Sequence, residues 1–235
     1  MTAGIFRTTV SLDVCDKAKI EDLGTQAARG RCLKVLTGSP VTIGDQELLE
    51  VELCEDGYQG YLKLGEYLAD ALVPATFTAN RVFDRAEILR TIPDVIAFLL
   101  AAMETPNSYL WGGTIGPDFD CSGLVQTAFS SHGIWLPRDA QNQYEFTLPH
   151  RVPPDQVEPG DLIFFSREKD DKRVNHVGVH LENGFYIHSS GIEHGRNGIG
   201  KDALSDSAGR VAANYNPYYW GSHRVCSSLS EKTDP

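Results

Sequence analysis

The stretch "DFDCSGLVQTAFSSHGIWLPRDA", residues 118–140, places a cysteine between an aspartate and a serine where a helical pattern begins. The apolar residues that share one face of this predicted helix are Leu124, Val125, Ala128 and Phe129. Gly133 follows the pattern as a stop signal. Asp120 stands where an N-cap would accept hydrogen bonds from unpaired backbone N–H groups. The stretch therefore predicts an α-helix that starts at Cys121.

The residue pattern of the chain changes near residue 85, from strand-like to helix-like. Residues 1–84 are predicted to form a small β-barrel, because short runs such as "FRTTVSLDV" alternate with turn signals such as Asp56-Gly57. A helical segment is expected within it, since "KAKIEDLGTQAARG" has apolar residues at helical spacing. Residues 85–235 begin with a helical period, "RAEILRTIPDVIAFLLAAMETPN", and continue with the strand-like runs "DLIFFS", "HVGVHLE" and "FYIHSS". This order predicts an α+β fold, in which helices precede an antiparallel sheet.

Composition excludes several classes of function. The 32 acidic and 21 basic residues give a net charge of −11, which argues against nucleic acid and against an anionic membrane as partners. The N-terminal segment lacks the pattern of a signal peptide, and no apolar run approaches the roughly 20 residues that span a bilayer. We therefore expect a cytoplasmic protein. Five cysteines at wide spacings, without a C-x-x-C pair, predict neither a disulfide framework nor a structural zinc site.

A thiol at a helix start can be a nucleophile, and Cys121 has the required position. Unpaired N–H groups and the positive end of the helix dipole favour the thiolate, so we expect a thiol pKa below its ordinary value. The alternative is an inert buried cysteine. A histidine 55 positions later, His176 in "NHVG", offers an imidazole that would accept the thiol proton.

Five segments in this order resemble the NlpC family of bacterial cell-wall cysteine peptidases: "YLWGG", "DFDCSGLVQTAF", "GIWLPRDAQNQ", "VEPGDLIFF" and "NHVGVHLENGFYIHSSG". The leading β-rich segment, with "GYQGYL", resembles a bacterial SH3-like module. The resemblance implies a papain-like catalytic domain over residues 85–235 behind an SH3-like barrel over residues 1–84. It also implies a cytoplasmic type of γ-D-glutamyl-L-diamino acid endopeptidase that needs no cofactor and no metal.

The resemblance also assigns roles. Cys121 in "DCSG" would be the nucleophile, His176 the general base, and His188 in "YIHSS" the third member that orients His176. The substrate would be a small murein peptide, L-Ala-γ-D-Glu-diamino acid, with a free N-terminus.

The hairpin "HVGVHLENGFYIHSS" tests this triad, since strand side chains alternate between two faces. A two-residue turn at Asn183-Gly184 would put His188 on the face opposite His176. A three-residue loop, Glu182-Asn183-Gly184, would pair Leu181 with Phe185 and put both histidines on one face. The triad therefore predicts the three-residue loop, although the sequence alone leaves both registers open.

Further residues are candidates for binding substrate. Asp120 and Ser122 flank Cys121 and would hold an amine and a carboxylate, or would only cap the helix. Arg138 would bind a substrate carboxylate, or would pair with Asp139 or a surface acid. Trp111 belongs to a groove-like segment rich in aromatic residues and glycine, and Tyr61 is the residue that the first domain would send to the subsite for the L-Ala amine.

Three other readings compete. A zinc site at His176 and His180 is disfavoured, because side chains four apart on a strand are about 13 Å apart. A thiol-dependent amidase or acyltransferase would share the chemistry up to the acyl-enzyme. A non-catalytic module that binds murein peptides would keep the groove alone. A cytoplasmic peptidase would act on released murein peptides, in cell-wall recycling.

Overall fold

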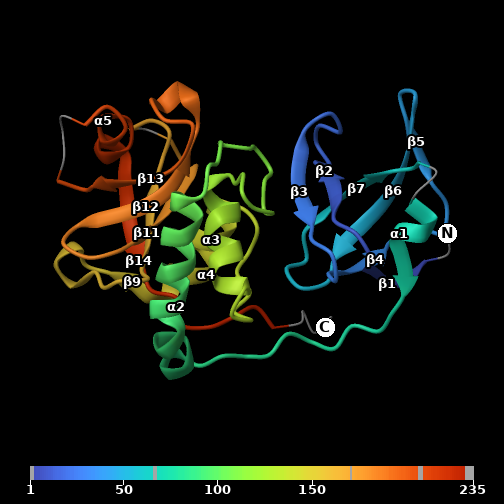
Figure 1. Ribbon diagram of the computed structural model, residues 1–235, viewed down its shortest axis with the longest axis horizontal. Helices are drawn as coiled ribbons and strands as arrows, with labels where there is room; N and C mark the ends of the chain where they lie inside the picture. The colour runs from blue at the N-terminus through green and yellow to red at the C-terminus, as the bar shows by residue number, and fades with distance from the viewer. Residues whose placement is uncertain (1–2, 66–67, 170, 206–208, 231–235) are drawn as a thin grey trace.

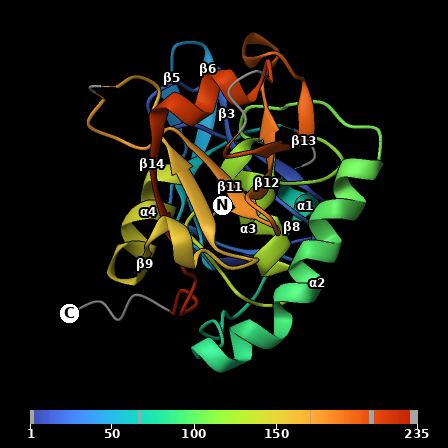
Figure 2. The ribbon, with the colours of Figure 1, turned by 90° about the vertical axis from the view of Figure 1, so that its left-hand side faces the viewer.

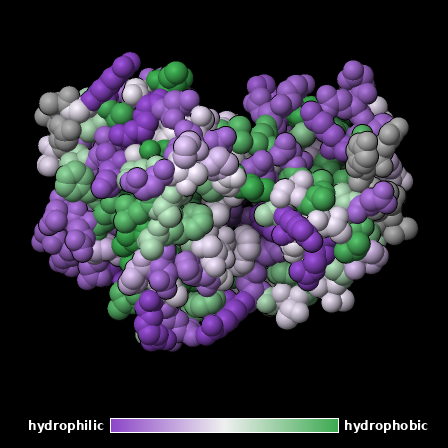
Figure 3. Space-filling view, in the orientation of Figure 1, coloured by the Kyte–Doolittle hydropathy of each residue, from purple (hydrophilic) through white to green (hydrophobic). Residues whose placement is uncertain are grey.

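The computed structural model describes residues 3–65, 68–169, 171–205 and 209–230. Two lobes lie side by side, one built from the N-terminal strands and the other from the helices and the C-terminal strands (Figure 1). A notch and a hollow separate parts of the two lobes, and hydrophobic patches lie on both of them among polar side chains (Figure 3). Among the described residues, no helix has both the length and the apolar character needed to cross a lipid bilayer.

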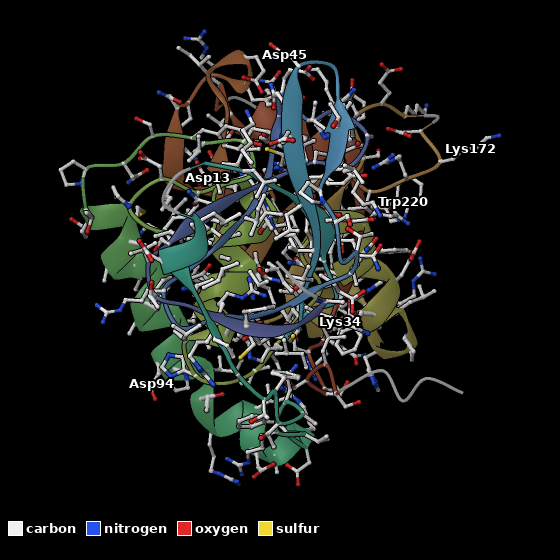
Figure 4. All side chains as sticks on the ribbon, turned by 90° about the vertical axis from the view of Figure 1, so that its right-hand side faces the viewer. Asp13, Lys34, Asp45, Asp94, Lys172 and Trp220 are labelled. Carbon is white, nitrogen blue, oxygen red and sulfur yellow. The ribbon has the colours of Figure 1, made fainter. Side chains whose placement is uncertain are left out.

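In the described residues, the N-terminal lobe is an eight-stranded sheet with one short helix. Its elements are β1 (Gly4–Thr8), β2 (Leu12–Cys15), β3 (Leu23–Ala27), β4 (Cys32–Val35), β5 (Val41–Ile43), β6 (Gln46–Leu53), β7 (Gln59–Lys63), α1 (Leu68–Ala71) and β8 (Leu72–Pro74). The strands follow the order β3-β2-β7-β6-β4-β1-β8, and β5 pairs with β6. In β4, Leu33 and Val35 are buried, whereas Lys34 between them is exposed (Figure 4). This alternation buries one face of the sheet.

One expectation for this lobe is wrong. The segment 17–30 was expected to be helical, but Leu23–Ala27 is the strand β3 and pairs with β2, Leu12 facing Ala27. The apolar spacing that mimics a helix is overridden by the hydrogen bonds and burial that β2 offers. The predicted turn at Asp56-Gly57 does lie between β6 and β7, and Gly57 has a positive φ of 71°.

The C-terminal lobe has helices packed against a six-stranded antiparallel sheet. Its helices are α2 (Arg85–Glu104), α3 (Cys121–Ser130), α4 (Ala140–Thr147) and α5 (Ala212–Tyr215), with 3₁₀ turns at Leu148–His150, Pro154–Gln156, Ile192–His194 and Asn216–Tyr218. Its strands are β9 (Arg151–Val152), β10 (Leu162–Phe165), β11 (His176–His180), β12 (Phe185–Ser190), β13 (Gly198–Ala203) and β14 (Tyr219–His223), in the order β13-β12-β11-β10-β14-β9 (Figure 2). The predicted α+β class is confirmed.

The core of this lobe lies between the sheet and the helices α2 and α3. Leu124 and Phe129 of α3 pack in one cluster with Phe164 of β10 and Val177 of β11. The helix α2 begins at Arg85, after a capping box formed by Asp84 and Glu87. The segment 75–84 joins this helix to β8.

The β11–β12 hairpin has the three-residue loop that the triad predicts. The Leu181 backbone N–H donates to the Phe185 carbonyl at 2.8 Å, and Val179 faces Ile187. Asn183 and Gly184 both have positive φ, 56° and 76°, which suits asparagine and glycine. The register therefore puts His188 across from Gly178 and on the same face as His176.

Gly178 is required by this register, since an added Cβ would lie 2.9 Å from the Ile187 carbonyl and 3.2 Å from the Cβ of His188. We expect Gly178→Ala to lower the free energy of unfolding by about 1–3 kcal/mol, because the strands must separate to admit the methyl group. Urea unfolding measures the change. The matched control is Gly38→Ala, where the added Cβ has nothing within 4 Å and the expected change is under about 1 kcal/mol. Equal effects of the two substitutions would contradict this view of the hairpin.

Candidate active site

The helix α3 starts at Cys121, and Asp120 caps it. The Asp120 carboxylate accepts a hydrogen bond from the Gly123 backbone N–H at 2.6 Å, and another from Gly112 at 2.9 Å. Cys121 is only 6% exposed, yet it lines a surface hollow. The predicted N-cap is therefore confirmed, and the cysteine is the first residue of the helix.

Arg138 anchors this helix start to the other lobe. Its guanidinium donates to Asp120 at 2.5 and 3.2 Å, to the Ser122 hydroxyl at 2.9 Å, and through Nε to the Thr25 hydroxyl of β3 at 3.0 Å. Arg138 is 3% exposed. Neither of the two pairings expected for Arg138, with Asp139 or with a surface acid, occurs. Its guanidinium nitrogens already donate to Asp120, Ser122 and Thr25. Arg138 therefore has no free pair of N–H groups with which to bind a substrate carboxylate.

Other contacts hold the two lobes together beside this pair. The side-chain oxygen of Gln26 accepts from the backbone N–H groups of Thr114 and Ile115, each at 3.1 Å. Gln126 of α3 donates to the Asp56 carboxylate at 2.8 Å. The N-terminal lobe therefore touches the loop before α3 and the helix itself.

His176 and His188 lie in contact on one face of the sheet. Nε2 of His176 is 2.6 Å from Nδ1 of His188, and Nε2 of His188 is 2.8 Å from the Asp202 carboxylate. The ring of Tyr215 stacks on His176 with centroids 4.1 Å apart. The structure brings the two predicted histidines together and adds Asp202, which the sequence did not reveal. Its strand, "GIGKDA", has two glycines and no alternating apolar pattern, so no strand was predicted there.

The expectation of a lowered thiol pKa is wrong for this arrangement. Burial raises the pKa of Cys121 to about 12, and the negative charge of Asp120 adds to the shift. Backbone hydrogen bonds from Val177 and Ser122 and the charge of Arg138 lower the pKa, but by less. The same aspartate that caps the helix therefore opposes the effect of the helix start on the thiol.

Burial also keeps the imidazoles neutral. It lowers the pKa of His176 well below 6.5, and the neighbouring His188 and His194 lower it further. Burial lowers the pKa of His188 too, although Asp202 raises it in part. The cysteine and His176 therefore rest as a neutral thiol and a neutral imidazole. The backbone of Val177, the residue after His176, hydrogen-bonds the thiol of Cys121 and so holds this strand beside it. A neutral thiol and a neutral imidazole can transfer the thiol proton when sulfur attacks a carbonyl.

Two hollows meet at this site. One, of about 220 Å³, contains Cys121, Asp120, Ser122 and Arg138, and the other, of about 100 Å³, contains His176. Trp111, 63% exposed, and Tyr109 line both hollows. The second hollow also contains Arg167, Glu193, His194 and Asn214. The structure therefore places Trp111 at the boundary of the two, as expected for a groove residue.

The residue that the N-terminal lobe sends to the first hollow is Tyr58 rather than Tyr61. Tyr58 lines it together with Asp16 and Gly24, whereas Tyr61 pairs with Cys15 and Glu50 inside the sheet and is absent from its lining. The choice of Tyr61 was therefore wrong. Tyr58 follows the Asp56-Gly57 turn, and loop residues are more often functional than strand residues. That signal favoured Tyr58.

A second aspartate in the first hollow was also missed. Among the described residues, none donates a hydrogen bond to the Asp139 side chain, and it does not cap α4. Partial desolvation raises the pKa of Asp139, Arg138 lowers it, and Asp120 and Asp16 raise it again. Asp139 is thus the carboxylate available to a cationic ligand. No group of three or more His, Cys, Asp or Glu side chains in the described part of the chain is arranged to hold a metal ion.

Replacing Arg138 tests the importance of the buried pair. We expect Arg138→Met to lower the free energy of unfolding by about 3–5 kcal/mol, because Asp120 remains buried without its partner. Urea unfolding gives the value. Arg81, whose ion pair with Glu87 is on the surface, provides the control, and Arg81→Met should cost about 1 kcal/mol or less. A loss at Arg138 as small as that at Arg81 would contradict the assignment.

The thiol pKa predicts how Cys121 reacts. We expect its alkylation by iodoacetamide to be slow at pH 7 and to rise about tenfold per pH unit to pH 9, because only the thiolate reacts. Peptide mass mapping separates Cys121 from the half-buried Cys54 and Cys226. A rate that is already on a plateau below pH 7 would show a thiolate–imidazolium pair and contradict the neutral pair.

Comparison with known proteins finds two matching domain families in the chain. Residues 106–229 match the NlpC/P60 family, and residues 14–65 match the bacterial dipeptidyl-peptidase Sh3 domain. The bifunctional muramidase/DL-endopeptidase CwlT of Bacillus subtilis is 40% identical over 109 residues, which are 44% of this chain and 32% of that protein. The γ-D-glutamyl-L-lysine dipeptidyl-peptidase of Bacillus cereus is 40% identical over 85 residues, 36% of this chain and 25% of that protein.

The first matched segments thus span between about a quarter and a third of the relatives' lengths. A solved NlpC/P60 family protein from Bacillus cereus covers 94% of this chain and 63% of its own, with 24% identity and a TM-score of 0.49. The family match extends over more than half of the chain and contains Cys121, His176 and His188. The chain belongs to the NlpC/P60 family, and an SH3-like domain precedes its NlpC/P60 domain.

Proposed function

We propose that the protein is a cysteine peptidase that hydrolyses the γ-D-glutamyl–L-diamino acid bond of small murein peptides with a free N-terminal L-Ala. The observation that supports it most is the placement of Cys121 at a helix start, between a hollow closed by the N-terminal lobe and a hollow that contains the paired histidine His176. The names of two relatives, both γ-D-glutamyl-L-lysine dipeptidyl-peptidase, also support a bond of this kind as the one that is cleaved.

The chemistry follows from the neutral pair. As the Cys121 sulfur attacks the γ-D-glutamyl carbonyl, its proton passes to His176, and the backbone N–H of Cys121 stabilises the oxyanion. His176 then returns the proton to the leaving amine, and a sulfur-bound acyl-enzyme remains. Water, deprotonated by His176, attacks this thioester and releases L-Ala-γ-D-Glu. Tyr109 lines the same hollow as Cys121, so its hydroxyl is a second candidate donor to the oxyanion.

Each of the two hollows binds one part of the substrate. The L-Ala-γ-D-Glu part occupies the hollow lined by Tyr58, Asp16 and Asp139. Its free ammonium pairs with Asp139, because Asp120 is already engaged with Arg138. The diamino acid leaves through the other hollow, where Glu193 faces its cationic end. This arrangement confines cleavage to peptides with an unblocked N-terminus.

A requirement for a free amine suits peptides that have already been released from the wall. We propose a role in the recycling of such peptides in the cytoplasm, where the net charge of −11 presents no obstacle, since an anionic polymer need not be bound. Fractionation of cells, followed by immunodetection of the protein, tests this location.

Mass spectrometry of peptide digests tests the activity. Wild-type protein should cleave L-Ala-γ-D-Glu-diaminopimelate or its lysine analogue at the γ-D-glutamyl bond and spare the N-acetylated peptides. Cys121→Ala should cleave none of them. Asp139→Asn should raise KM about 10- to 100-fold with a smaller change in kcat, because a charged hydrogen bond to the ammonium is lost.

Asp45→Asn is the matched control, since Asp45 is exposed in the turn between β5 and β6 (Figure 4). Equal cleavage of the acetylated peptides would contradict the free-amine requirement. If every peptide survives while Cys121 is still alkylated, the thiol serves a different acyl substrate. A protein that binds the peptides without cleaving them would be a binding module.

A further inference from the structure

Asp202 contacts His188 on the side of its ring that faces away from His176. It stands on β13 beside β12, two residues from Gly200, which faces His188. Because Gly200 has no side chain, the Asp202 carboxylate reaches Nε2 of His188 from a diagonal position, at 2.8 Å. Arg196 passes over the same glycine, since an added Cβ there would lie 2.4 Å from the guanidinium carbon. Arg196 donates to Asp202 at 2.6 Å.

In the row His176–His188–Asp202, only one assignment of donors and acceptors fits both hydrogen bonds. Although burial raises the pKa of Asp202, hydrogen bonds from His188 and Arg196 hold it below its ordinary value, so the group is an ionised acceptor. His188 must then carry its proton on Nε2, and its Nδ1 is a bare acceptor. The contact at 2.6 Å requires a proton on Nε2 of His176, and the Nδ1 of neutral His176 is therefore bare.

Arg196 would impose the opposite direction if Asp202 were absent. Its Nη1 lies 3.4 Å from Nε2 of His188, and a guanidinium can only donate. A bare Nε2 would accept from Arg196, which would move the proton of His188 to Nδ1. His176 would then accept on Nε2 and hold its own proton on Nδ1. Asp202 and Arg196 thus favour opposite tautomers of His188. The Asp202 carboxylate is closer to Nε2 of His188, at 2.8 Å against 3.4 Å, so the tautomer with the proton on Nε2 is the stable one.

We propose that Asp202 is a positioning residue that sets the tautomers of both His188 and His176, and so leaves Nδ1 of His176 bare to accept the thiol proton of Cys121. The tautomers stand independently of the substrate; only their consequence for turnover rests on the proposed function. In the acid–base step the S–H bond of Cys121 breaks, the proton forms an N–H bond at Nδ1, and the sulfur keeps the electron pair for its attack. A protonated Nδ1 could not begin this step.

The tautomers can be observed directly by two-dimensional ¹H–¹⁵N NMR of protein labelled at histidine, which distinguishes a protonated Nε2 from a protonated Nδ1. In the wild type we expect both His176 and His188 to carry the proton on Nε2. In Asp202→Ala we expect both protons on Nδ1. In the same variant kcat/KM should fall about 10²- to 10⁴-fold, the range of an acid–base contribution, while KM changes little.

Two variants separate this role from a structural one. Arg196→Gln removes the ion pair of Asp202 but keeps its bond to His188, so both tautomers should remain as in the wild type. The double variant Asp202→Ala/Arg196→Gln removes both competitors and should give a mixture of tautomers, with kcat/KM between those of the wild type and of Asp202→Ala. If Asp202→Ala does not fold, Asp202→Asn replaces it, and its amide should likewise donate to Nε2 of His188.

Several outcomes would overturn the proposal. A wild-type His188 that is protonated on Nδ1 would exclude it at once, and so would wild-type tautomers retained in both Asp202→Ala and Asp202→Asn. A loss of kcat/KM in Arg196→Gln as large as that in Asp202→Ala, with tautomers unchanged, would show that the ion pair matters and the tautomer does not. If no peptide is cleaved by the wild type, the NMR result still decides the tautomers, and the failure belongs to the proposed function alone.

Discussion

The buried ion pair between Asp120 and Arg138 is the interaction on which the rest of the site depends. It closes the N-terminus of α3, positions the residue before Cys121, and reaches the hydroxyl of Thr25 in the other lobe. A guanidinium and a carboxylate taken out of water must satisfy nearly all their donors and acceptors, and these two do so with each other and with Ser122, Gly123 and Gly112. The geometry of the helix start is therefore held by charges rather than by packing alone.

This arrangement has an electrostatic consequence for the thiol. The negative charge that caps the helix lies next to Cys121, and both it and burial favour the neutral thiol. The imidazole of His176 is neutral for a related reason, because burial lowers its pKa and the neighbouring imidazole of His188 lowers it further. Because the resting thiol and imidazole are both neutral, Cys121 becomes nucleophilic only when a carbonyl lies next to its sulfur and the thiol proton passes to His176. Such a thiol is protected from adventitious oxidants and alkylating agents, which react with thiolate.

Both lobes line the hollow that contains Cys121. The C-terminal lobe contributes Cys121 itself, and the N-terminal lobe contributes Tyr58 and Asp16. Contacts through Gln26 and Asp56 fix the loop before α3 and the helix itself against this lobe. Because residues of both lobes line the hollow, its size depends on how the two lobes pack against each other.

Sequence patterns were sufficient where the signal was local. The helix from Cys121 to Ser130, its Asp120 cap and the strands that carry His176 and His188 follow from periodicity and from side-chain chemistry within a few residues. The alternation of the β11–β12 hairpin even reduced its register to two choices. The family of the C-terminal domain could be recognised because the ordered segments around Cys121 and the histidines are specific to it.

Tertiary structure decided everything that depends on partners distant along the chain. Arg138 lies 113 positions from Thr25, so no local pattern could reveal that its guanidinium is engaged in joining the lobes. The pKa of Cys121 depends on burial by the whole lobe, which outweighs the helix start, and segment 23–27 became a strand because β2 was available to pair. Asp202 reaches His188 only because β13 pairs with β12 through glycines that leave space, and a side chain's neighbours across a sheet are set by register rather than by its own sequence.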